Sequence, residues 1–102
     1  MMNVNDLISA AVQLFNEGKY AEVIEKLEQA NKITNENTQI AEQINIQSGL
    51  GRCHLELAMK SKNKYEADKL FGNAVKHYQE CLRLAIYRKN SIQQQISAQS
   101  GL

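Results

Sequence analysis

The spacing of apolar residues over residues 7–33 constrains this chain more than any other feature. Two runs repeat an apolar side chain every three or four positions, which is the spacing of an amphipathic helix. Gly18 stands between the runs and can take the left-handed conformation that ends a helix. Because few residues separate the runs, the chain must reverse tightly, and we expect two short antiparallel helices. The apolar positions are Leu7, Ile8, Ala11, Leu14 and Phe15, then Tyr20, Val23, Ile24, Leu27, Ala30 and Ile33.

Capping residues indicate where these two helices begin and end. Asn3 is followed three residues later by Asp6, which resembles a reciprocal helix cap, so the first helix should span about 4–16. The second should span about 20–32. The segment 34–38 consists of capping and turn residues, and it predicts a connection followed by the start of another helix.

A second and longer pair of helices is expected after this connection. Residues 39–61 keep the helical spacing and are interrupted only by Gly49 and Gly51. Each glycine costs roughly 1 kcal/mol in a helix interior, so the pair indicates that another backbone comes close. A turn at 61–64 should lead into a helix over about 65–87. One side of that helix carries Leu70, Phe71, Ala74, Tyr78, Cys81, Leu82 and Ala85.

The order of small and large residues in the first hairpin is Leu7, Ala11, Leu14, Gly18, Tyr20, Val23, Leu27 and Ala30. This order resembles one tetratricopeptide repeat (TPR), in which small residues let paired helices approach. The Leu50-Gly51 pair and Ala74, Tyr78 and Cys81 resemble matching positions of a second repeat. The family's usual glycine at the position of Ala11 and its closing proline are missing. The resemblance implies an all-α fold of antiparallel helical hairpins stacked as a right-handed array.

The second repeat departs from the family in its length. Between Gly51 and Ala74 the chain is about 11 residues longer than the standard unit, which corresponds to about three helical turns. The inserted residues include no proline. We therefore expect both helices of this hairpin to be longer and to protrude beyond the first hairpin. A looser connecting loop is the alternative.

The last residues repeat an earlier segment. Residues 43–50 and 95–102 are identical at six of eight positions. Ser91 and Gln94 resemble another cap, so we expect about five helices, the fifth beginning near residue 91. Such a helix must fold back or find another chain, as in the opening part of a longer array. The expected organisation is a single domain over 1–102, with a first repeat at 1–34, an elongated second repeat at 37–89, and the start of a third repeat or a capping helix at 91–102.

The charges are balanced overall but unevenly distributed. The chain has 12 basic and 11 acidic residues, so no net field draws it to nucleic acid or to an anionic membrane. Residues 1–50 hold three basic and seven acidic residues, whereas residues 51–102 hold nine and four. Attraction between stacked repeats explains this asymmetry, and head-to-tail self-association is the alternative.

The start of the chain and its cysteines predict a compartment. The first residues lack the basic leader and apolar run of a signal peptide, and no window is long and apolar enough to insert in a membrane. We expect a cytoplasmic protein. Cys53 and Cys81 fall inside predicted helices, and they should be buried free thiols of a reducing compartment.

The sequence contains no motif for catalysis or for a cofactor. It has no phosphate-binding glycine loop, no metal-binding helix motif and no nucleophile elbow, so we predict neither an enzyme nor a cofactor. Zinc binding by Cys53 and His54 with His77 and Cys81 is not expected, because a turn near residue 63 places residue 53 opposite residue 73. Nucleic-acid binding through tyrosines is likewise not expected, since most of them fit helix-packing stripes.

The resemblance implies a groove lined by the first helix of each repeat. This groove would receive a peptide or helix of another protein. Related cochaperones clamp a terminal carboxylate with Lys and Asn, and Ile8 and Val12 stand at those positions here, so an amphipathic helix fits better than an acidic tail. The candidate groove residues are Asn5, Ile8, Val12 and Asn16 in the first repeat, and Asn45, Ser48, Arg52 and Glu56 in the second.

The sequence therefore predicts a non-catalytic protein-interaction module or scaffold. The alternative is a self-association domain that forms a homodimer through its last helix. The candidate residues for that contact are Ile92, Ile96 and Leu102.

Overall fold

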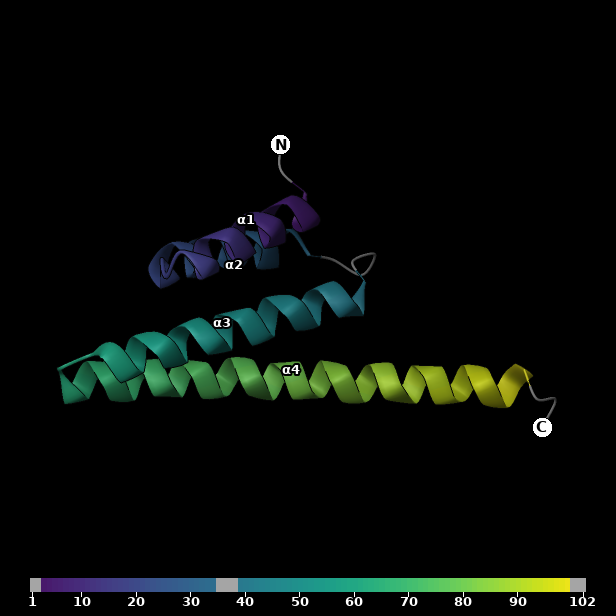
Figure 1. Cartoon of the computed structure of the whole chain (residues 1–102). Coiled ribbons are helices and arrows are strands. Elements are labelled where there is room, and N and C mark those ends of the chain that lie inside the picture. Colours follow the sequence, from purple (N-terminus) through teal and green to yellow (C-terminus); the bar gives the residue numbers. More distant parts are fainter. Residues whose placement is uncertain (1–2, 35–38, 100–102) are drawn as a thin grey trace.

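The computed structural model describes residues 3–34 and 39–99, with side chains described as far as residue 90. Four helices account for nearly all of these residues, and their order is α1, α2, α3 and α4. Each packs on the one before it, so that α2 contacts α1 and α3, and α3 contacts α2 and α4 (Figure 1). The bounds are Val4–Asn16 for α1, Tyr20–Ile33 for α2, Ile40–Lys60 for α3 and Lys64–Gln99 for α4.

The two ends of α1 confirm the predicted capping box and the predicted tight turn. The Asp6 amide donates to Asn3 Oδ1 over 2.8 Å, and the Asp6 carboxylate accepts from the Asn3 amide, which together form a capping box. Gly18 has a φ of 77°, a conformation that side chains disfavour. The amide of Lys19 returns to Leu14 O at 3.0 Å, so the reversal is as tight as the sequence required.

The second hairpin is long on both sides. α3 has 21 residues and α4 has 36, against 13 and 14 for α1 and α2. The Asn63 side chain caps α4 by accepting from the Glu66 amide at 3.1 Å. Both helices therefore run up to a short turn, as expected, and the alternative of a loose loop is wrong. The turn end extends past the α1–α2 hairpin (Figure 1).

One expected boundary is wrong. The sequence predicted that the fourth helix ends near residue 87 and that a fifth begins near residue 91, but α4 continues to Gln99. No Pro or Gly lies between Gly72 and Gly101, so nothing in the sequence breaks the backbone hydrogen bonds there. A capping pattern such as Ser91 and Gln94 does not stop a helix that already runs through it.

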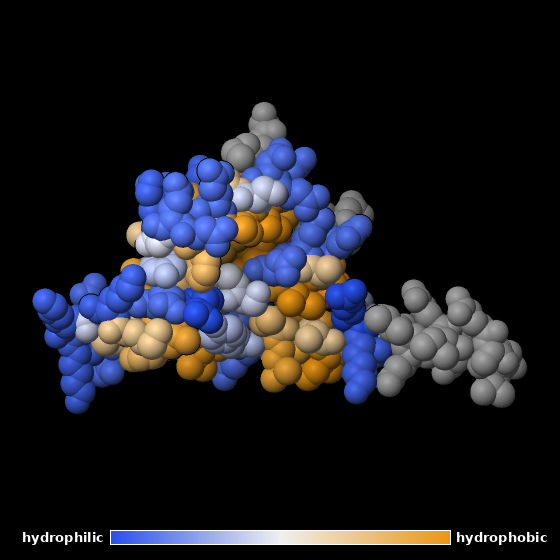
Figure 2. All heavy atoms as spheres, in the orientation of Figure 1, coloured by the Kyte–Doolittle hydropathy of each residue, from blue (hydrophilic) through white to orange (hydrophobic). Residues whose placement is uncertain are grey.

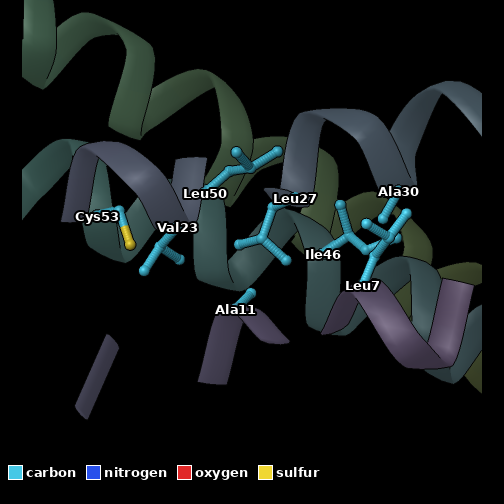
Figure 3. Packing of buried hydrophobic residues seen from close by; sticks show 8 residues of the cluster. All are labelled: Leu7, Ala11, Val23, Leu27, Ala30, Ile46, Leu50 and Cys53. Atoms are coloured by element: carbon cyan, nitrogen blue, oxygen red, sulfur yellow. The ribbon is translucent and has the colours of Figure 1, made fainter. Parts of the chain in front are cut away.

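The apolar core lies among the first three helices. Leu27 of α2 lies in the middle of the buried side chains, between Val23 and Ile46 (Figure 3). Ile46, Leu50 and Cys53 of α3 are completely buried. Burying a large aliphatic side chain stabilises the folded state by about 1.5 to 3 kcal/mol. The full cluster is Leu7, Ala11, Val23, Leu27, Ala30, Ile46, Leu50 and Cys53.

The two glycines of α3 make room for side chains of neighbouring helices. A Cβ at Gly49 would lie 2.7 Å from Leu27 Cδ1, and one at Gly51 would lie 3.0 Å from the ring of Tyr78. The close approach predicted from the glycines is therefore present, but the neighbours are side chains of α2 and α4 where a backbone was expected. The pair lets α3 pack tightly on both sides.

Ala30 provides a test of this packing, because its side chain is completely buried between α2 and its neighbours. Ala30→Phe should lower the free energy of unfolding by about 1 to 3 kcal/mol through overpacking. Urea denaturation measures the change. Ala21→Phe, on the exposed side of the same helix, is the matched control and should leave stability nearly unchanged. Equal stability of both variants would contradict the packing described here.

Candidate functional site

A groove with a volume of about 580 Å³ runs between α1 and α3. Its α1 wall is apolar and consists of Ile8, Val12 and Phe15, whereas its α3 wall presents Asn45, Ser48 and Arg52. Hydrophobic surface is visible on the first hairpin above α3 (Figure 2). Ala11, Val23, Leu27, Gly49 and Tyr78 complete the lining.

The structure brings together five of the eight residues predicted for the groove. Ile8 and Val12 meet Asn45, Ser48 and Arg52 across it, although α1 and α3 are separated in sequence by all of α2. Val12 is 55 % exposed, so a large apolar side chain is left open to a partner. These residues come together because α2 packs behind both helices and its core residues form the floor.

Three of the predicted residues do not line the groove. Asn5 and Asn16 are exposed on α1 outside it. Glu56 lies one turn beyond Arg52 on α3, and its carboxylate accepts from Arg52 Nε at 2.9 Å. The Arg52 side chain is 57 % exposed, so this ion pair contributes at most about 1 kcal/mol to stability. Glu56 therefore orients the groove's arginine without touching the groove.

Sequence reasoning missed Phe15 and Tyr78 as lining residues. Phe15 belongs to the α1 stripe but was expected only in the core; its ring packs edge-on against Tyr20 with 5.3 Å between centroids. Tyr78 comes from α4 and reaches the groove across Gly51. The signal for Tyr78 was the glycine itself, because a helical glycine marks a position where a large neighbouring group fits.

A polar cluster lies on the other side of α3, facing α4. His77 Nδ1 and Gln47 Oε1 are 2.8 Å apart, and Gln47 Nε2 donates to Asn31 Oδ1 at 3.3 Å. The rings of His54 and His77 stack with centroids 5.4 Å apart and an angle of 11°. His54 Nδ1 is buried without a hydrogen-bond partner. This cluster joins three helices through neutral side chains.

Burial lowers the pKa of both histidines below the ordinary value of 6.5. For His54 the neighbouring His77 lowers the pKa further, and Glu28 of α2 opposes the shift. For His77, Glu28 again opposes it, and Lys76 adds a small lowering effect. Both rings are therefore neutral near pH 7, which suits their stacked arrangement.

Both cysteines are free thiols, and Cys53 is buried as expected whereas Cys81 is only partly buried. Burial is the main cause that raises the pKa of Cys53 to about 11, with Glu56 adding to it and Arg52 opposing it, so the thiol stays protonated. Cys81 lies against the backbone of Ile44, with Sγ 3.9 Å from its carbonyl oxygen. This pairing matches the predicted hairpin register. In the part of the chain that the structure describes, no three His, Cys, Asp or Glu side chains are grouped to hold a metal ion.

Comparisons of the chain with protein-family models, curated proteins and solved structures give no match. Within the described residues, no helix combines the length and the apolar composition needed to cross a bilayer. The predicted self-association residues Ile92, Ile96 and Leu102 lie outside the residues whose side chains are described. The candidate sites are therefore the groove and the exposed surfaces of the described helices.

The histidine pair predicts a pH dependence of stability. Because folding lowers both pKa values, the unfolded chain binds more protons below about pH 6.5, so stability is full above that pH and falls as pH decreases. Urea midpoints on either side of pH 6.5, kept above about pH 5 where carboxylates begin to titrate, measure the effect. His54→Phe, which removes the nitrogen that lacks a partner, should flatten the dependence. An equally steep decline in this variant would contradict the assignment.

Proposed function

We propose that this chain is a non-catalytic protein-interaction module whose α1–α3 groove binds an amphipathic helix of another protein. The observation that supports the proposal most directly is the two-sided lining. An apolar wall of Ile8, Val12 and Phe15 faces a polar wall of Asn45, Ser48 and Arg52. A ligand with one apolar and one polar face satisfies both walls, as in other helix-in-groove interactions.

The chemistry of the walls defines the partner further. The apolar side chains of the partner would lie on Val12 and Phe15 of α1, at the three- and four-residue spacing of a helix. On the opposite side, Asn45 and Ser48 can hydrogen-bond to uncharged polar groups, and Arg52 keeps donors beyond the one used by Glu56. The apolar share of the lining disfavours an acidic peptide tail as the main ligand.

The resemblance of the first hairpin to a TPR agrees with this assignment. In that family the first helix of each hairpin lines the binding groove. In this chain α1 is the first helix of the first hairpin, and α3 is the first helix of the second. Ile8 and Val12 stand at the positions where related proteins use Lys and Asn to bind a terminal carboxylate. We therefore propose that the groove contacts the ligand along its helix and does not bind its terminus. A scaffold of this kind requires no cofactor, and we propose that it acts in the cytoplasm.

Val12 provides the test, with Ile33 as a matched control. Helical peptides displayed on phage, with randomised apolar and polar faces, serve as the probe, and the selected peptides are titrated by fluorescence anisotropy. Val12→Glu places a carboxylate on the apolar wall and should weaken binding at least about tenfold, since unpaired burial of a charge is costly. Ile33→Glu changes a residue of similar exposure outside the groove and should bind as the unmodified chain does.

Two results would contradict the proposal. The first is that no peptide binds detectably after selection. The second is that selected peptides bind Val12→Glu and the unmodified chain equally well, which would place their site elsewhere on the molecule.

A further inference from the structure

α4 carries a row of large apolar side chains that the described chain leaves exposed. Phe71, Val75, Tyr78, Leu82 and Ile86 are between 39 % and 61 % exposed. Figure 2 shows a hydrophobic band over the middle of α4, bordered by hydrophilic residues. A contiguous exposed apolar row of this length is unusual for a monomeric surface and marks an interaction site.

Apart from Tyr78, whose ring packs over Gly51 of α3, this row is distinct from the side of α4 that packs on α3. Ala74 and Leu84 are buried, and His77 and Cys81 contact α3. At about 100° per residue these positions centre roughly 120° away from the exposed row. The sequence predicted a single packing stripe of Leu70, Phe71, Ala74, Tyr78, Cys81, Leu82 and Ala85. The structure divides that stripe into a row that contacts α3 and a row that is open, with Tyr78 at the border between the two.

We propose that the exposed row of α4 is a homodimer interface in which two copies of this chain pack α4 antiparallel across a two-fold axis. The intervals between successive apolar residues of the row are nearly the same whether they are counted from Phe71 or from Ile86. A symmetric antiparallel contact requires such a spacing. With the axis between Tyr78 and Gln79, Phe71 meets Ile86 of the partner subunit. In the same register Val75 meets Leu82 of the partner subunit. The four large side chains away from the axis therefore each have an apolar counterpart, whereas Tyr78 lies beside the axis, level with Gln79 of the partner subunit.

The charges at the two ends of the row support this register. Asp68 precedes Phe71 and Lys89 follows Ile86, and both are exposed. Both project within about 60° of the centre of the row, estimated from the helical repeat. The register that aligns the apolar residues also places Asp68 opposite Lys89 of the partner subunit, at both ends of the contact. The basic residues Lys76 and Arg83 lie about 100° from the row, so they do not face each other across it.

A second copy fits this row better than an unrelated helix does. An unrelated helix could bind without any symmetry between the two halves of the row. Here four of the five apolar residues, and the opposite charges at the ends, are arranged symmetrically about one point. Asp68 and Lys89 make no ion pair with any other described residue, so both charges are available to a partner. The interface is separate from the α1–α3 groove except at Tyr78, which borders both.

Sedimentation equilibrium of the full chain over a concentration series tests the dimer. The unmodified chain should dimerise reversibly, and Leu82→Asp should raise the dissociation constant on the order of a hundredfold, because it buries a carboxylate among apolar groups. Tyr87→Asp is the matched control. Tyr87 is 56 % exposed on the same helix but projects roughly 140° from the row, so its replacement should leave dimerisation unchanged. Circular dichroism verifies that both variants remain helical.

A charge exchange tests the register. Asp68→Lys alone should weaken the dimer about tenfold by placing like charges together, and adding Lys89→Asp should restore it. A chain that stays monomeric at every concentration would overturn the proposal. A dimer that Leu82→Asp does not weaken would also overturn it. If Val12→Glu breaks that dimer, the contact lies in the groove. If Ile92→Asp breaks it, the contact lies at the end of the chain.

Discussion

The structure depends on the burial of α3 on two sides. One side presents Ile46, Leu50 and Cys53 to α1 and α2, and all three are fully buried. A neighbouring side presents Gln47 and His54, and it packs on α4 through a hydrogen bond and stacked rings. α3 has 21 residues and is covered on both of these sides. It joins the short α1–α2 hairpin to the long helix α4, which would otherwise have no layer to pack on. Both candidate surfaces exist because α3 holds the other helices in place.

The polar side of α3 fixes the position of α4. Leucine-rich contacts tolerate sliding, but two hydrogen bonds of Gln47 exist in one register only: its Oε1 accepts from His77 Nδ1, and its Nε2 donates to Asn31 of α2. The cost is the desolvation of the imidazoles and an unsatisfied nitrogen on His54. In return Tyr78 is held over Gly51, at the point where the groove and the exposed row of α4 meet. The packing of α4 and the lining of both candidate surfaces are therefore linked through this cluster.

The two open surfaces differ in the ligand that suits them. The groove has one apolar and one polar wall, so it favours a ligand with two different faces. The α4 row is apolar along its middle with opposite charges at its ends, and the occupant proposed for it is a second copy of the chain. A dimer formed through α4 would carry two grooves, and a partner with two helices would then bind more tightly than the affinity of either groove alone. Such an arrangement suits a scaffold.

The sequence by itself determined the local structure. Apolar spacing, the Asn3–Asp6 cap, Gly18 and the turn at residue 63 each act within a few residues, so the four helix starts and the hairpin register followed from them. The eight-residue repeat shows the limit of such patterns, because residues 43–50 lie in the middle helix whereas residues 95–99 extend α4. Only the tertiary structure decided which apolar residues of α4 face α3, that His54 stacks on His77, and that Phe15 and Tyr78 line the groove. These outcomes depend on the angles at which helices distant in sequence meet, and those angles are set by side-chain packing across the whole molecule.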